Sequence, residues 1–184
     1  VRFGPKLPLI VGPLIAAAGY LLFMLPAAGG SYWLTFLPPV IFLGLGMAVS
    51  VAPLTTTVMN SVPQNHAGIA SGVNNAVART AGLLAIAVLG IVMLGVFKSE
   101  LDGHLAESKI PSAVAESVRA ESTKLAAIAV PKNLEPVTQQ LIRRGIDESF
   151  VSGFRKVMLI GAMLAVASAI SALALIGTEK IDIE

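Results

Sequence analysis

The sequence contains no cysteine, which excludes disulfide bonds and thiolate metal sites. Charge is also scarce: Asp, Glu, Lys and Arg make up 13% of the 184 residues, whereas soluble domains carry about 25%. None of these four residue types occurs between Lys6 and Arg79, and further uncharged runs cover residues 80–97 and 157–178. Hydrophobic residues supply 55% of the chain, and the mean hydropathy is +0.80. The composition therefore predicts an all-α integral membrane protein.

Several kinds of functional site are missing from the sequence as well. It has no histidine and carboxylate pattern with metal-ligand spacing, no glycine-rich phosphate loop and no nucleophile motif. We therefore expect no enzyme, no cofactor and no metal site. The net charge of +2 is small and dispersed, so it gives no reason to expect a nucleic acid partner. No Asp or Glu lies inside the apolar segments, so a proton-carrying carboxylate is not expected in this chain.

Four apolar segments are long enough to cross a bilayer, whose hydrocarbon core takes about 20 helical residues. We expect four transmembrane helices, in two hairpins, at about residues 7–28, 33–52, 68–97 and 157–177. Residues 1–97 would thus hold three of these helices. Residues 98–152 would form an extramembrane helical loop, and residues 153–184 the last helix and a short polar tail.

The chain begins with Val1, and an apolar segment follows within a few residues. We interpret it as a piece of a longer chain. A signal peptide is the alternative, because Arg2 and Lys6 precede an apolar run that ends in small residues at 27–29. That run is longer than a typical signal core, and further apolar segments follow it.

The second span, 33–52, carries Pro38 and Pro39, which we place inside the membrane. An internal proline removes a backbone hydrogen bond and bends a helix. Two interpretations stay open, a kink that serves packing and a bending helix beside a transport path. The polar stretch 53–67 that follows is expected to be a loop, and its His66 either titrates near neutral pH or is simply solvated.

The organising segment of the chain is the helix expected at residues 68–97. Gly68 and Gly72 stand four residues apart, and Ala76 and Thr80 continue the same row. A second row of mostly small residues contains Ala78, Gly82, Ile86 and Gly90. Rows of small residues let another helix approach closely, so we predict that this side contacts protein and not lipid.

The same helix carries three polar side chains, Asn74, Asn75 and Arg79. Such groups are costly in lipid and normally face protein or a water-filled cavity. We predict that Arg79 is buried against protein and bonded to backbone carbonyls or to neighbours such as Asn75, one turn away. The alternative is an arginine that snorkels to the headgroups.

The loop 98–152 holds most of the charge in the chain. Pro111 is expected to open a helix that runs through Val130 and is stopped by Pro131. A second, shorter helix is expected to follow Pro136 and to end at Gly145. Both would be amphipathic caps that lie on the helix bundle or at the membrane interface.

Residues 2–6, with Arg2, Gly4 and Lys6, resemble the tail of the cytoplasmic loop motif of the major facilitator superfamily. Residues 52–82 and 148–163 are similar to the corresponding stretches of the fourteen-span drug:proton antiporters of the EmrB/QacA type. The resemblance implies that the chain is the C-terminal part of a secondary transporter, supplying the third to sixth helices of the C-terminal half of the bundle. The second span would then line the cavity, and the third would pack across the interface with the other half.

The same resemblance implies proton-coupled efflux of drugs or other amphipathic small molecules across the inner (plasma) membrane. The partners would be the lipid bilayer, the remaining helices of the parent transporter and the small-molecule substrate. A complete small four-span protein with a structural or assembly role is the alternative.

Two patterns predict opposite orientations. Basic residues flank the 98–152 loop, which by charge bias would place it in the cytoplasm. The resemblance places it outside, with Arg2, residues 53–67 and the C-terminal tail inside. The charge rule weakens for loops approaching about 60 residues, so we expect the orientation that the resemblance implies.

Overall fold

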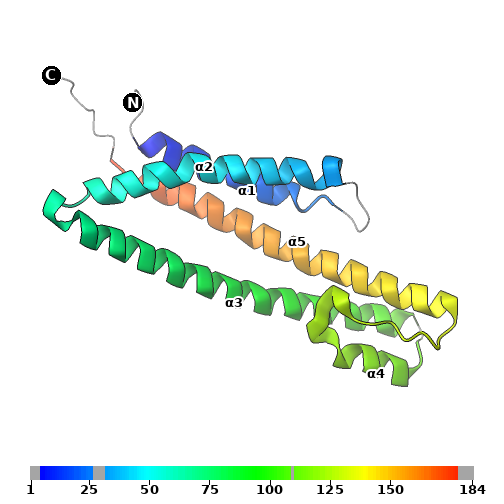
Figure 1. The fold of residues 1–184 in the computed structure, drawn as a ribbon. Helices are drawn as coiled ribbons and strands as arrows, with labels where there is room; N and C mark the ends of the chain where they lie inside the picture. Colours follow the sequence, from blue (N-terminus) through cyan, green and yellow to red (C-terminus); the bar gives the residue numbers. More distant parts are fainter. Residues whose placement is uncertain (1–4, 27–31, 109, 178–184) are drawn as a thin grey trace. The chain divides into compact units, whose positions relative to one another are not determined.

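The computed structural model describes residues 5–26, 32–108 and 110–177, and every regular element in these ranges is a helix (Figure 1). Arg2 and Gly4 lie outside the described residues. The elements, in chain order, are α1 (Lys6–Leu22), the π-helical turn η1 (Tyr32–Phe36), α2 (Leu37–Asn60), the 3-10 turn η2 (Gln64–His66), α3 (Ala67–Glu107), α4 (Ser112–Ala120), the 3-10 segment η3 (Ser122–Ala127) and α5 (Pro136–Leu175).

These elements form two compact units, to both of which the long helices α3 and α5 contribute. The first unit contains α1, α2, the part of α3 up to Ala85 and the part of α5 from Met158. The second unit contains residues 86–157, including α4 and η3. Each unit has its own packing.

Three helical segments are long and apolar enough to cross a membrane: Tyr32–Asn60, Gln64–Glu107 and Pro136–Leu175. The fourth apolar helix, α1, has 17 residues and ends at Leu22, short of the predicted 28. Pro26 explains the early end, because a proline disfavours helical geometry in the residue before it and has no amide to donate. The all-helical membrane class is confirmed, while the count of four spans stays a prediction.

Glycines bring α1 and α2 into close contact within the first unit. A Cβ added to Gly46 would lie 2.6 Å from the backbone nitrogen of Ala16 and 2.7 Å from the carbonyl oxygen of Gly12. One added to Gly19 would lie 2.9 Å from the backbone nitrogen of Leu43. These two helices therefore approach backbone to backbone, the arrangement that small residues permit in membranes. The sequence pattern predicted such a contact for the 68–97 helix and did not indicate this one.

The first two prolines of the second span, Pro38 and Pro39, occupy the first turn of α2, where proline is tolerated. They directly follow the π-helical turn η1, so both lie inside the helical segment Tyr32–Asn60, as predicted. Both interpretations of these prolines stay predictions. Pro53 is inside α2, which continues to Asn60, so the predicted loop 53–67 shrinks to residues 61–66. Threonine hydroxyls after Pro53 bond to preceding carbonyls, as in the 2.7 Å bond from Thr57 Oγ1 to the Pro53 oxygen.

The 98–152 region is also organised differently. The predicted helix 111–130 is instead α4 followed by η3, and Leu125 breaks helical geometry with φ 54° and ψ −128°. The predicted short helix ending at Gly145 is instead the beginning of α5, which continues through Gly145 to Leu175. A Cβ on Gly145 would lie 3.2 Å from His104 Cβ of α3, so this glycine serves packing between helices and not helix termination.

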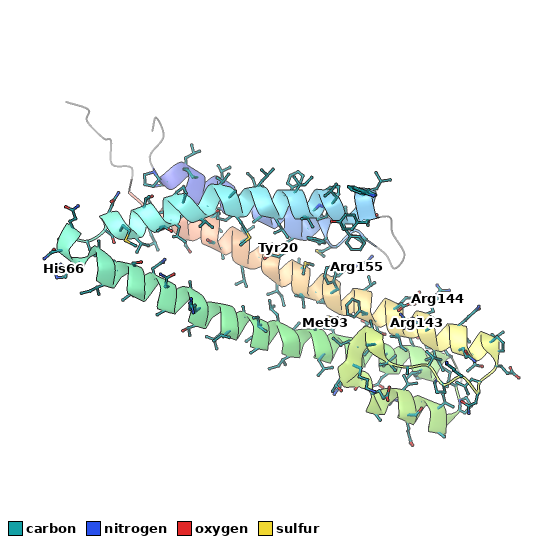
Figure 2. The ribbon with its side chains drawn as sticks, in the orientation of Figure 1. Tyr20, His66, Met93, Arg143, Arg144 and Arg155 are labelled. Carbon is teal, nitrogen blue, oxygen red and sulfur yellow. The ribbon has the colours of Figure 1, made fainter. Side chains whose placement is uncertain are left out.

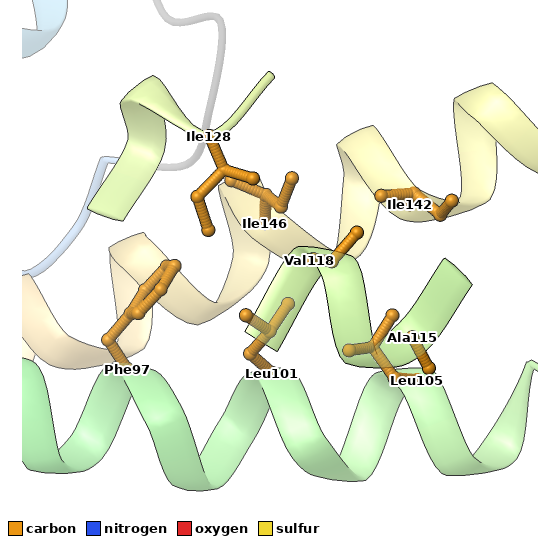
Figure 3. Packing of buried hydrophobic residues seen from close by; sticks show 8 residues of the cluster. All are labelled: Phe97, Leu101, Leu105, Ala115, Val118, Ile128, Ile142 and Ile146. Atoms are coloured by element: carbon orange, nitrogen blue, oxygen red, sulfur yellow. The ribbon is translucent and has the colours of Figure 1, made fainter. Parts of the chain in front are cut away.

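Residues from four segments of the second unit form a hydrophobic core (Figure 3). Eight of its side chains are at most 4% exposed: Phe97, Leu101 and Leu105 of α3, Ala115 and Val118 of α4, Ile128 after η3, and Ile142 and Ile146 of α5. The α3 members follow one another at four-residue spacing and thus share one helix face. Residues predicted to be caps on a bundle therefore have a core of their own.

Candidate functional site

An open groove of about 490 Å³ lies where the end of α2 meets the beginning of α3. Figure 2 labels His66 at this corner, within the turn η2 that joins the two helices. The lining combines valines and Ile69 with three polar side chains, Ser61, His66 and Asn74. An apolar surface with a few polar groups is the composition typical of small-molecule sites.

The groove arises from a tight connection between two helices. Pro63 has an extended ψ of 147° and precedes η2, and the His66 amide donates a 2.8 Å hydrogen bond to the Pro63 carbonyl. The chain therefore reverses within a few residues after Asn60. Four valines then line the groove: Val58 from the end of α2, Val62 from the turn that follows it, and Val73 and Val77, one turn apart on α3.

The three polar residues predicted on α3 are placed unequally. Asn74 is half-buried and lines the groove, whereas Asn75 and Arg79 are exposed. Burial of Arg79 against protein is thus not provided by the described residues. It would need helices beyond this chain, so it stays a prediction.

The predicted packing row on α3 is open. A Cβ added to Gly68, Gly72, Gly82 or Gly90 would meet no described atom within 4 Å. Large apolar side chains near the row are exposed too, for example Ile69 at 66% and Val77 at 63%. A helix with this much apolar exposure requires lipid or other helices around it. The row therefore remains a candidate contact surface without a partner among the described residues.

The other predicted site residues lie apart from the groove. Pro38 and Pro39 are at the opposite end of α2 from Val58, about 30 Å away at 1.5 Å per residue. Pro39 is buried, and its carbonyl lies 3.1 Å from a Cβ added to Gly19, so it belongs to the α1–α2 contact. Lys6 begins α1. Within the described ranges, no group of three or more histidines and carboxylates is placed to hold a metal ion.

Three helices that are long and apolar enough to cross a membrane, and that expose most of their surface, are typical of a multi-pass membrane protein. The particular family follows from comparison. Residues 1–99, more than half of the chain, match the Major Facilitator Superfamily model. The chain belongs to the Major Facilitator Superfamily, a family of membrane transporters.

Several bacterial proteins are similar to nearly the whole chain. The chain is 28% identical over 178 residues to the tetracenomycin C resistance and export protein of Streptomyces glaucescens, covering 92% of this chain and 32% of the relative. It is 28% identical over 174 residues to the multidrug resistance protein Stp of Mycobacterium tuberculosis, covering 90% and 31%. It is 27% identical over 171 residues to the multidrug efflux pump LfrA of Mycolicibacterium smegmatis, covering 91% and 32%.

The chain thus spans about a third of the length of these relatives. No solved structure matches it. The comparisons confirm the resemblance seen in the sequence. They support the interpretation that the chain is part of a transporter related to drug exporters. The groove at the α2–α3 corner was missed by sequence reasoning, because residues 53–67 were taken as a loop and not as helix.

Proposed function

We propose that this chain is the C-terminal part of a proton-coupled exporter of drugs or other amphipathic small molecules in the inner (plasma) membrane. One observation carries the proposal: three relatives named for drug resistance, export or efflux are similar to this chain over at least 90% of its length. No observation favours the alternative of a small structural or assembly protein.

Within the exporter, the first half of α3 would contact the helices that this chain lacks. The physical support is the row of small residues from Gly68 to Thr80, which is open, together with exposed Asn75 and Arg79. An exposed arginine in an apolar helix is unfavourable in lipid, so a protein or water-filled neighbour is expected. We place this face of α3, and the groove that Asn74 lines, beside the transport path.

Proton coupling would depend on a carboxylate elsewhere in the exporter. The uncharged runs of this chain contain no Asp or Glu that could carry a proton through the membrane. The role of this chain would be to support the path and form part of its wall. The drug-like substrate would meet an apolar groove with a few hydrogen-bonding groups.

The test uses the full-length transporter, expressed in cells that lack their own drug exporters. Efflux of a fluorescent lipophilic cation is measured with and without a protonophore, and membrane expression is quantified. We expect efflux that the protonophore abolishes. Arg79→Ala should reduce efflux at least tenfold with expression retained, while Arg79→Lys should retain part of it.

Lys98→Ala provides a matched control, because Lys98 is an exposed basic residue of the same helix, outside the uncharged run. We expect it to transport like the parent. Normal efflux by Arg79→Ala would remove the proposed role of Arg79 without touching the transporter assignment. Absence of efflux of any amphipathic compound by the well-expressed parent would contradict the exporter proposal itself.

A further inference from the structure

We propose that residues 86–157 form a clamp that holds α3 and α5 at a fixed spacing, so that this part of the two helices moves as one body during transport. We call this region the α3–α5 clamp. The inference rests on the proposed transport function for its purpose, but its geometry comes from contacts inside the second unit alone. Conformational change would then fall on the first half of α3.

The hydrophobic core supplies the first argument. Phe97 and Ile146 are fully buried, and Leu101 and Ile142 are 1% exposed. The bridging segments complete this core, because Val118 of α4 and Ile128 after η3 are 1% and 2% exposed. Separating α3 from α5 would expose these side chains to water or leave voids, and packed cores do not deform continuously.

Close helix contact supplies the second argument. A Cβ added to Gly153 of α5 would lie 3.2 Å from the Met93 carbonyl oxygen of α3, and one added to Gly145 would lie 3.2 Å from His104 Cβ. Figure 2 labels Met93 on α3. Gly145 and Gly153 are eight residues apart in sequence, so close approach persists over about 12 Å of α5.

Polar contacts join the same elements around the core. Arg119 Nε of α4 donates to Asp102 Oδ1 of α3 at 2.6 Å, and His104 Nε2 of α3 lies 3.7 Å from Glu148 Oε2 of α5. Arg143 Nη1 of α5 donates to the Ala126 carbonyl of η3 at 3.2 Å. These exposed contacts are individually weak. Their role is to fix the angular positions of helices that the core already holds together.

Among the described residues, no side chain from the first half of α3 belongs to this core. Ile69 and Val73 in that half are 66% and 57% exposed. The groove with α2 is open. One continuous helix therefore has one end built into the core and one end whose small-residue row meets no described helix, and we assign the conformational change to the second end.

The absence of cysteine makes a cross-linking test direct within this segment. His104→Cys and Gly145→Cys would place two Cβ atoms 3.2 Å apart, close to the about 3.5–4.5 Å that a disulfide joins. In an otherwise cysteine-free full-length transporter, we expect oxidation to form this disulfide equally fast with and without a proton gradient and substrate. We expect the cross-linked protein to retain at least half of the efflux rate of the reduced protein.

A second pair, Met93→Cys with Gly153→Cys, repeats the test if the first double variant is poorly expressed, and each single cysteine variant serves as a control. A bifunctional maleimide joining Val58→Cys to Val73→Cys across the groove provides the contrast, and we expect at least a tenfold loss of efflux.

Cross-linking that stops efflux, with recovery after reduction, would overturn the clamp and leave the exporter proposal intact. Failure of both pairs to cross-link in an active protein would overturn it too. Full efflux by the groove-linked protein would overturn the assignment of movement to the α2–α3 end. A parent that exports nothing would contradict the exporter proposal, while equal cross-linking rates would still support the fixed spacing.

Discussion

At the residue scale, glycines of similar sequence context have opposite surroundings. Gly44 and Gly46 are two residues apart on α2, yet a Cβ on Gly44 would meet nothing within 4 Å, whereas one on Gly46 would meet backbone atoms of α1. Backbone cannot rotate away as a side chain can, so the helices would have to move apart. The two positions thus give a matched pair of substitutions.

We predict that Gly46→Ala destabilises the full-length protein and that Gly44→Ala does not. Overpacking at a tight contact costs about 1–3 kcal/mol, whereas alanine in an open helical position gains up to about 1 kcal/mol over glycine. The measurement is the midpoint of thermal unfolding in detergent. Equal midpoints for the two variants would contradict the close α1–α2 contact.

Two carboxylates outside the membrane-spanning runs predict how the clamp responds to acid. The hydrogen bond from Lys124 chiefly lowers the pKa of Glu121 below its ordinary 4.5. The hydrogen bond from Arg144 chiefly lowers the pKa of Glu148, and the positive charges of Arg144 and His104 lower it further. Each contribution to stability is present above pH 4.5 and is lost as the pH falls through the lowered pKa of the folded state.

We therefore expect the clamp to lose a small amount of stability as the pH falls below 4.5, because both carboxylates are partly exposed and exposed ion pairs contribute little. The measurement is the unfolding midpoint of the full-length protein against pH, for the parent and for Glu121→Gln combined with Glu148→Gln. The parent should lose more on acidification than the double variant. High salt should reduce the difference. Identical pH profiles would contradict the predicted contributions.

At the scale of elements, α3 is the helix whose neighbours are least defined by the described residues. Its first half exposes apolar side chains and a row of small residues, while its second half is built into the clamp core. Its backbone hydrogen bonds lie within the helix, so the helix forms without partner helices. The described residues do not show what the faces of its first half contact. Substitutions in the row test which neighbour it has.

We predict that Gly72→Leu abolishes efflux or expression, while Gly72→Ala has a mild effect. A leucine would hold a partner helix away from the backbone, whereas a methyl group adds little volume. The measurements are efflux and the amount of folded transporter in the membrane. If leucine is tolerated as well as alanine, this face of α3 contacts lipid.

At the scale of the whole molecule, one labelling experiment can determine which side of the membrane each loop faces. The family resemblance implies that residues 61–66 lie in the cytoplasm and residues 98–152 outside. Ser122 is 7% exposed and unsuited to labelling, but Thr123 beside it and Ser61 are both exposed. In that orientation these two residues would lie on opposite sides of the membrane.

We predict that an impermeant thiol reagent labels Thr123→Cys and not Ser61→Cys on intact cells, in a cysteine-free full-length transporter. Permeabilised cells provide the control, since both positions should then react. The reverse pattern would agree with the charge bias around residues 98–152 and would contradict the orientation that the family resemblance implies.

The sequence by itself determined the membrane class, the all-helical class and the family. These follow from uncharged apolar runs and from local motifs, which need no tertiary contacts to be recognised. Residues 52–82 carried the resemblance although part of that stretch was taken for a loop. Two prolines act differently from the prediction. Pro53, expected in a loop, is accommodated inside α2. Pro26, expected inside a helix that reaches residue 28, follows an α1 that ends at Leu22.

Only the tertiary structure decided which small residues make contacts and where helices end. Gly145 lies inside α5 because His104 of α3 packs against it, and Gly12 and Gly46 meet although they are far apart in sequence. A glycine row records that close approach is possible, but not which helix approaches. That depends on faces from distant segments meeting in space, which is why the α1–α2 contact, the groove and the clamp were invisible to a reading of local pattern.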